Sequence, residues 1–174
     1  MEALARQLER EPARRLVFCS QNHDQVGNRA LGDRPRADEL RLRAAALLFA
    51  PQTPLLFMGE EYGERRPFQF FTDHIDPAIA EATREGRRRE FAGFAGFSAD
   101  DVPDPQAPGT FERSKLDRSR SDETLRAFYR ELLELRRTLP KEVAVEVEGR
   151  RVRLRRGSAL LDVDLDARTA ELRR

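Results

Sequence analysis

The sequence has 174 residues, of which 39% are hydrophobic and 36% are charged. This length allows one sizeable domain, or a domain with a small appendage. The 32 Lys and Arg residues nearly balance the 31 Asp and Glu residues, so the net charge of +1 excludes a global pull toward nucleic acid or anionic lipid. The single cysteine, Cys19, cannot form an internal disulfide, and no apolar stretch is long enough to span a bilayer. We therefore expect a cytoplasmic protein with no nucleic-acid partner and no membrane partner.

The first third of the chain predicts a βαβ unit. The expected elements are, in chain order, a charged helix over residues 2–10, a buried strand over Arg15–Ser20, a polar loop over residues 21–35, a helix from Glu39 to about Ala50 with Asp38 as its N-cap, and a strand over Pro54–Met58. A continuous apolar run such as PLLFM is typical of a fully buried parallel strand. The order strand, helix, strand is that of a parallel α/β sheet.

The pattern changes toward the end of the chain. The expected elements are a helix over residues 77–91, a proline-rich loop over residues 101–110, a helix with Ser121 as its N-cap that ends before Pro140, and short antiparallel strands from Val143 onward. The sequence thus changes from α/β to all-β near residue 140. We expect two domains, residues 1–140 and residues 141–174.

Polar side chains gather in the loops that follow the two parallel strands. These loops are QNHDQVGNR, which begins at Gln21, and GEEYGERRPFQFFTDH, which begins at Gly59. Function collects at the carboxyl ends of strands in parallel α/β proteins. Carboxylates, amides, a histidine and aromatic rings together suit a neutral polyhydroxy ligand such as a sugar. The loop residues alone leave two other readings open, because Asp24 could cap a turn and His23 could be a structural histidine.

A family resemblance rests on these loops and on further strings. QNHDQVGNR resembles the N-H-D motif at the end of the seventh barrel strand in the α-amylase superfamily, and TPLLFMGEEYG resembles its eighth-strand motif. The strings QNHDQVGNRALGDR, PLLFMGEEYGERRPFQFFTDH, EGRRREF and PDPQ…TFERSKLD are together similar to the malto-oligosyltrehalose trehalohydrolase family. The similarity runs from about Leu16 to Leu139. It implies the last strands and helices of a (β/α)8 TIM barrel, followed by a small C-terminal antiparallel β-domain.

The resemblance also implies an activity. These enzymes are retaining glycosidases that cleave the α-1,4 bond next to the trehalose end of maltooligosyl trehalose and release trehalose. Carried over to this chain, Asp24 is the carboxylate that stabilises the oxocarbenium-like transition state. His23 and Gln25 are expected to bind sugar hydroxyls, and Phe70 or Phe71 is expected to stack on a sugar ring. The expected partner is maltooligosyl trehalose or a related α-glucan, and neither a cofactor nor a metal is implied.

The chain departs from the family pattern in one important respect. In the family, the nucleophile and the acid/base carboxylate lie on earlier barrel strands, and a whole barrel needs ~250 residues. We therefore expect this chain to be a C-terminal portion that is inactive by itself. Glu60 and Glu61 are expected to be structural rather than catalytic. An unpaired barrel edge should favour self-association.

Three alternatives remain at this stage. A 1,4-α-glucan branching enzyme uses the same stabilising aspartate but transfers the chain to a sugar hydroxyl. A non-catalytic carbohydrate-binding remnant would agree with the missing carboxylates. An Arg-rich nucleic-acid binder is disfavoured by the balanced charge, and the run Arg87-Arg88-Arg89, which has Glu85 and Glu90 nearby, is typical of a solvated helix face.

Overall fold

A computed structural model describes residues 15–92, 98 and 101–174 and divides the chain into two compact units. Of the described residues, we call those in 15–20, 35–63 and 121–174 the sheet unit, and those in 21–34 and 64–120 the motif unit. The helix expected over residues 2–10 lies outside the described residues. The expected domain boundary at residue 140 stays a prediction. None of the described helices is both long enough and apolar enough to cross a bilayer.

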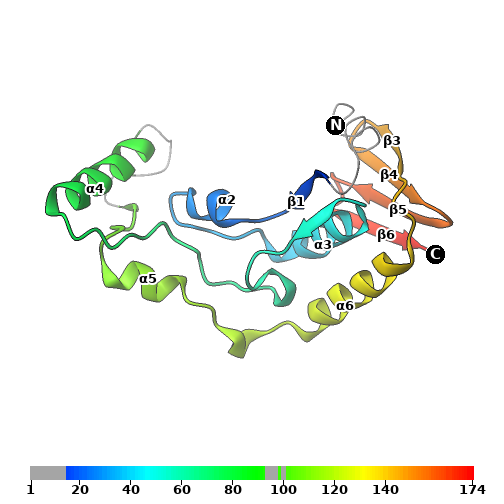
Figure 1. The fold of residues 1–174 in the computed structure, drawn as a ribbon, viewed down its shortest axis with the longest axis horizontal. Coiled ribbons are helices and arrows are strands. Elements are labelled where there is room, and N and C mark those ends of the chain that lie inside the picture. Colours follow the sequence, from blue (N-terminus) through cyan, green and yellow to red (C-terminus); the bar gives the residue numbers. More distant parts are fainter. Residues whose placement is uncertain (1–14, 93–97, 99–100) are drawn as a thin grey trace. The chain divides into compact units, whose positions relative to one another are not determined.

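The sheet unit begins with the expected βαβ order (Figure 1). Strands β1 (Val17–Cys19) and β2 (Thr53–Leu55) pair in parallel, and helix α3 (Leu40–Phe49) lies between them in the chain. The expectation of fully buried strands was wrong, since Val17 is 64% exposed and Leu55 is 41% exposed. Among the described residues these strands pair only with each other, so part of their apolar surface stays open. Self-association through this edge stays a prediction.

Both predicted N-caps were off by one residue. The Asp38 carboxylate does not cap α3, because it accepts hydrogen bonds from Arg36 at 3.0 and 3.1 Å and from Arg168 at 2.8 Å. Helix α6 (Glu123–Thr138) is capped by Asp122, which accepts from the Leu125 amide at 3.0 Å. The neighbouring Ser121 hydroxyl donates to a carboxylate of α6 instead. The cap is the side chain that reaches a free amide of the first turn, and adjacent Ser and Asp residues are nearly equivalent in this respect.

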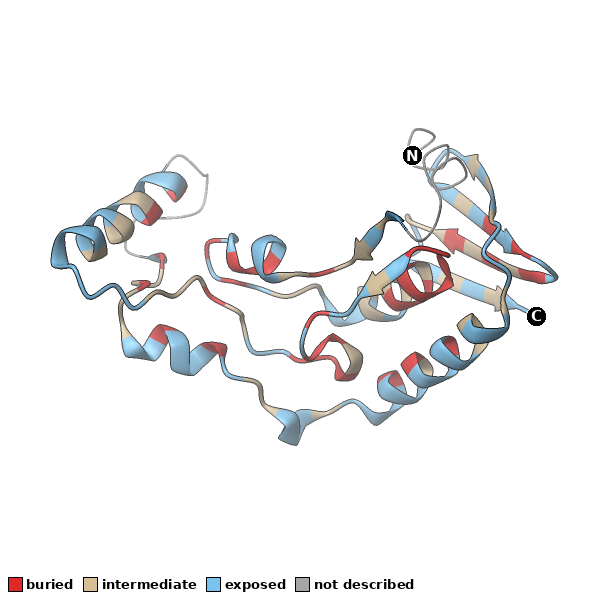
Figure 2. Cartoon of the chain, viewed as in Figure 1, coloured by how far each residue is buried: buried red, intermediate tan, exposed pale blue. Residues whose placement is uncertain are grey.

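The second part of the sheet unit is the expected antiparallel sheet. Strands β3 (Ala144–Glu148), β4 (Arg151–Arg156), β5 (Ala159–Asp164) and β6 (Thr169–Arg173) pair in chain order, each with the next. Alternate residues of β5 are buried, which is the period of two that one covered sheet face requires. Figure 2 shows the buried residues concentrated on α3 and along one side of α6. The main core joins these two helices to the sheet, and its buried members are Ala44, Ala45, Leu48, Phe49, Leu125, Tyr129, Leu132, Leu154, Ala159, Leu161 and Val163.

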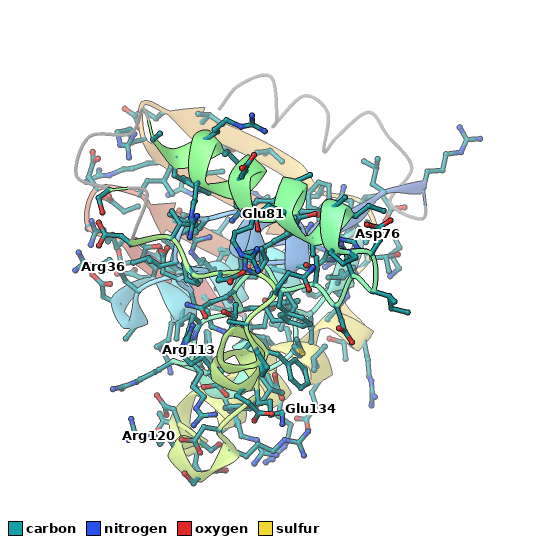
Figure 3. The ribbon with its side chains drawn as sticks, turned by 90° about the vertical axis from the view of Figure 1, so that its left-hand side faces the viewer. Arg36, Asp76, Glu81, Arg113, Arg120 and Glu134 are labelled. Atoms are coloured by element: carbon teal, nitrogen blue, oxygen red, sulfur yellow. The ribbon has the colours of Figure 1, made fainter. Side chains whose placement is uncertain are left out.

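The motif unit has short helices separated by irregular segments. Its helices are α2 (His23–Gly27), α4 (Pro77–Phe91) and α5 (Pro108–Ser114). The bounds of α4 agree with the sequence prediction, and Asp76 caps its first turn (Figure 3). The polar segment 21–35 was expected to be a loop, but it contains α2. A helix of five residues has too few turns to show a hydrophobic period, so the sequence pattern does not reveal it.

Candidate functional site

Asn22 sets the conformation of the N-H-D sequence. Its extended backbone (φ −154°, ψ 177°) precedes α2, and its side-chain oxygen accepts a hydrogen bond from the Gln25 amide at 2.7 Å. Its carbonyl accepts from the Val26 amide at 3.0 Å. This is the arrangement of a helix N-cap. Asp24 is therefore not the capping residue, which removes the alternative role that the sequence left open for it.

His23 and Asp24 lie side by side on the first turn of α2. The His23 Nε2 atom is 3.4 Å from Asp24 Oδ1, and the side chains are 72% and 68% exposed. Gln25, the third candidate on this helix, is also exposed. The opposite side of the turn is buried, with Val26 only 2% exposed. The turn thus presents a carboxylate, an imidazole and an amide to solvent, a set of donors and acceptors that can bind adjacent hydroxyl groups.

The aromatic candidates lie in the irregular segment 64–76, and both are half-buried. The Arg87 guanidinium lies 4.8 Å from the centroid of the Phe70 ring, so it covers one face of that ring. Phe71 contacts Phe68 and Phe111 edge to face, at centroid distances of 5.8 and 5.2 Å. Phe111, on α5, is 45% exposed and was not considered from the sequence. Which ring stacks on a sugar stays a prediction.

Hydrogen bonds hold this aromatic segment against the loop that follows α2. The Phe68 amide donates to the Gly32 carbonyl at 2.8 Å. The Gln69 side chain donates to the Leu31 carbonyl at 3.4 Å and accepts from Arg113 at 3.1 Å. Arg113 lies on α5 (Figure 3). The structure therefore brings the two predicted loops together within the motif unit.

Gly32 provides the close approach of these two segments, and its replacement by alanine should loosen the motif unit. Its φ of +65° disfavours any side chain, and an added Cβ would lie 2.4 Å from the Phe68 carbonyl oxygen. We expect Gly32→Ala to lower the free energy of unfolding by about 2 kcal/mol or more. Urea denaturation measures this loss. The matched control is Gly86→Ala in α4, where an added Cβ meets nothing within 4 Å and should stabilise by about 0.5–1 kcal/mol. Equal effects of the two changes would contradict the close-approach argument.

Arg87 is a site residue that the sequence analysis missed. The run Arg87-Arg88-Arg89 was assigned to a solvated helix face, and this holds for Arg88 and Arg89, which are exposed. It is wrong for Arg87, which is 8% exposed and donates to the carbonyls of Gly27 and Arg29. The sequence spacing could have indicated this burial, because Arg87 lies four residues before the buried Phe91 and so lies on the same side of the helix.

Glu60 belongs to the sheet unit, in a 3-10 turn (Glu60–Tyr62) that follows β2. It is 1% exposed, and its carboxylate accepts from the Ser20 hydroxyl at 3.5 Å and from the Tyr129 hydroxyl at 3.4 Å. Burial raises the pKa of Glu60 to about 7, and its hydrogen bonds only partly oppose this rise. A buried, partly neutral carboxyl group agrees with the structural role expected from the sequence. Among the residues described, no three His, Cys, Asp or Glu side chains gather as metal ligands would.

The fold is shared with an α-amylase-type enzyme. A solved structure from Salmonella typhimurium, provisionally assigned as an alpha amylase, matches 88% of this chain with a TM-score of 0.74 and 41% sequence identity. The match covers 29% of that protein. The chain therefore forms part of an α-amylase-type barrel with an antiparallel sheet after it, and the predicted fold class is confirmed.

Several sequence relatives are named malto-oligosyltrehalose trehalohydrolase. Malto-oligosyltrehalose trehalohydrolase from Arthrobacter ramosus is 51% identical over 147 residues, which are 79% of this chain and 25% of the relative. The protein of the same name from Deinococcus radiodurans is 51% identical over 133 residues, which are 71% of this chain and 22% of the relative. The one from Saccharolobus solfataricus is 40% identical over 127 residues, which are 71% of this chain and 21% of the relative. The predicted resemblance to this family is confirmed, and the chain spans about a quarter of the length of these relatives. No protein-family model matches the chain.

Proposed function

We propose that this chain supplies the Asp24-bearing portion of a retaining α-glycosidase. The proposed reaction is hydrolysis of the α-1,4 bond next to the trehalose end of malto-oligosyltrehalose. One observation carries the proposal: Asp24 and His23 are exposed side by side on a turn that Asn22 caps, in a chain about half identical to trehalohydrolases. A carboxylate that is not needed for capping, and that solvent reaches, is available to a sugar.

Asp24 is proposed to act on the sugar that carries the scissile bond. Its carboxylate accepts hydrogen bonds from ring hydroxyls, favours the distorted ring and stabilises positive charge as the oxocarbenium-like transition state forms. His23, 3.4 Å away, and Gln25 bind neighbouring hydroxyls and fix the position of the ring. Phe70 or Phe71 is proposed to stack on an apolar sugar face.

The two other carboxylates of the reaction are proposed to lie outside these 174 residues. A retaining glycosidase places a nucleophile and an acid/base ~5 Å apart on opposite sides of the scissile bond. Asp24 cannot fill both roles. Glu60, with 1% exposure, cannot contact a sugar unless the turn around it opens. The isolated chain is therefore proposed to bind the substrate without cleaving it.

The test combines a binding titration with an activity assay on the purified chain. We expect weak binding of maltooligosyl trehalose, which changes in the amide chemical shifts of α2 report, and no release of trehalose. Asp24→Asn should weaken binding about tenfold, because it removes a charged hydrogen-bond acceptor. The control is Glu85→Gln, which removes an exposed carboxylate of α4 and should leave the affinity unchanged.

Each contrary result has a definite meaning. Equal affinities of the Asp24→Asn variant and the unaltered chain would contradict the role of Asp24. Release of trehalose would contradict the proposal that the other carboxylates lie elsewhere. Equal affinity for a maltooligosaccharide that lacks the trehalose end would favour the branching enzyme, or a general α-glucan binder, over the trehalohydrolase.

A further inference from the structure

Arg87 contacts the backbone at the end of α2 through one edge of its guanidinium. Its Nη2 atom donates to the carbonyl oxygens of Gly27 and Arg29, both at 3.3 Å. Between these residues lies Asn28, whose amide donates to the carbonyl oxygen of Asp24 at 3.0 Å. Arg87 thus holds both neighbours of the residue that closes the turn on Asp24.

The remaining surfaces of the same guanidinium are also occupied. Its Nη1 atom donates to a Glu90 carboxylate oxygen at 2.7 Å. The ring centroids of Phe70 and Phe91 each lie 4.8 Å from the guanidinium carbon. Arg87 is only 8% exposed, and a carboxylate and two aromatic rings hold its guanidinium in one orientation. A planar donor held in this way gives the two carbonyls a fixed position.

The turn of α2 is not fixed by its own backbone hydrogen bonds alone. It has five residues, which is too short for a helix that is stable by itself in water. Its N-terminal end is capped by Asn22. At its C-terminal end the Asp24 and Val26 carbonyls accept from the adjacent backbone amides, whereas the Gly27 carbonyl accepts from Arg87. A cation near these carbonyls is also favoured by the direction of the peptide dipoles. Arg87 supplies both a hydrogen-bond donor and a positive charge at the C-terminal end of the turn.

We propose that Arg87 is a positioning residue for the sugar-binding turn. It acts through the Gly27 and Arg29 carbonyls to fix the orientation of His23 and Asp24, and it contacts no sugar itself. The expected effect of Arg87 on sugar binding rests on the proposed function. The ordering of α2 by Arg87 does not depend on any ligand.

The neighbouring arginines of α4 provide matched controls. Arg88 is exposed. Arg84 is half-buried one turn earlier and pairs with Asp104 at 2.9 Å, so it fastens the same helix to a different segment. A loss that comes from general loosening of α4 should therefore follow from Arg84→Met, whereas a loss that comes from the α2 carbonyls should follow only from Arg87 variants.

The experiment compares Arg87→Met, Arg87→Lys, Arg84→Met and Arg88→Met in the full chain. Amide hydrogen exchange of Val26 and Asn28 reports the order of α2, and titration with maltooligosyl trehalose reports the affinity. We expect Arg87→Met to accelerate exchange of both amides about tenfold and to weaken binding to a similar extent, because it removes charged hydrogen bonds. Arg87→Lys keeps the charge and should restore part of both. The Arg84 and Arg88 variants should leave α2 exchange unchanged.

Each outcome decides the proposal. Unchanged α2 exchange in Arg87→Met, or acceleration of the same size in Arg84→Met, overturns it. If Arg87→Met does not fold, the lysine variant decides, since a folded lysine variant with native exchange and affinity also overturns it. If the unaltered chain binds no sugar, the proposed function fails, and the exchange data still decide whether Arg87 orders the turn.

Discussion

Replacement of Arg156 by methionine should lower the free energy of unfolding by about 3 kcal/mol or more, because one buried and two partly buried hydrogen bonds from its guanidinium to backbone carbonyls are lost. Arg156 lies at the end of β4 and is fully buried. Its guanidinium donates to the carbonyl oxygens of Phe49 at 2.6 Å, Pro140 at 2.8 Å and Leu139 at 3.3 Å. These contacts join the end of α3, the end of α6 and the antiparallel sheet at one point.

A second arginine extends the same arrangement. Arg136, in the last turn of α6, donates to the Leu48 carbonyl at 3.0 Å, to the Pro51 carbonyl at 3.1 Å and to the carbonyls of Ala50 and Gln52. The two cations thus satisfy the carbonyls at the C-terminus of α3, where the peptide dipoles favour positive charge. Burial lowers the pKa of Arg156 to about 10, and the charge of Arg136 adds to this effect. Arg156 therefore remains charged at neutral pH.

The control for Arg156→Met is Arg155→Met on the same strand. Arg155 is exposed, so the same change of side chain there should alter stability by less than about 0.5 kcal/mol. Urea denaturation followed by circular dichroism measures both. Losses of equal size would show that the sheet tolerates methionine poorly in general and that the carbonyl contacts of Arg156 are not the cause.

The place of Arg156 could have been predicted from the sequence, but its partners could not. The alternation Val152, Leu154 predicts the covered face of β4, and Arg156 continues it by the same period of two. The identity of its acceptors depends on how α3 ends and on which part of the sheet covers that end. Phe49 lies 107 residues earlier in the chain, and no local pattern connects it with Arg156.

The site shows the same division between local and distant information. The position of the N-H-D sequence after a strand, the bounds of α4 and the antiparallel sheet follow from local patterns. The helix α2, the burial of Arg87 and the packing of Phe71 against α5 depend on contacts between distant segments. The error at Ser121 has a different origin, since the neighbouring Asp122 has nearly equal capping ability. The error at Asp38 arises because its carboxylate pairs with Arg36 and with the distant Arg168.

The free energy of unfolding should fall as the pH rises from about 4.5 to about 7. Over this range the Glu60 carboxyl group of the unfolded chain ionises, whereas in the folded protein burial raises its pKa to about 7. The folded state therefore binds more protons than the unfolded state, and the contribution of Glu60 to stability is fully present below pH 4.5 and is lost as the pH rises to about 7. A shift of this size corresponds to at most about 3 kcal/mol, and screening by nearby water lowers the expected loss to about 2 kcal/mol.

Other acidic groups act at lower pH and with the opposite sign. Hydrogen bonds to their charged forms lower the pKa values of Asp38, Asp101, Asp117, Glu123 and Asp164. Such groups stabilise the folded state above their unfolded pKa values, and this contribution is lost as the pH falls through their folded values. Their effect lies mainly below pH 4.5, so it is separated from that of Glu60.

Glu60→Gln should abolish the fall in stability between pH 4.5 and 7. The two hydroxyls bond different carboxylate oxygens, so the amide oxygen can accept from one of them and the amide nitrogen can donate to the other, but the group no longer ionises. The variant should therefore match the unaltered chain at pH 4.5 and exceed it by about 2 kcal/mol at pH 8. Urea denaturation across this range measures the difference, with Glu61→Gln, which is only half-buried, as the control.

The result also bears on the role of the carboxylates. A retaining glycosidase needs an ionised nucleophile that contacts the sugar. If the glutamine variant removes the pH dependence, Glu60 is a buried carboxyl group that stabilises the fold best when it is neutral, and it is unsuited to that role. A glutamine variant with the same pH dependence as the unaltered chain would mean that Glu60 is ionised and solvated in solution, and its assignment as a structural residue would then be wrong.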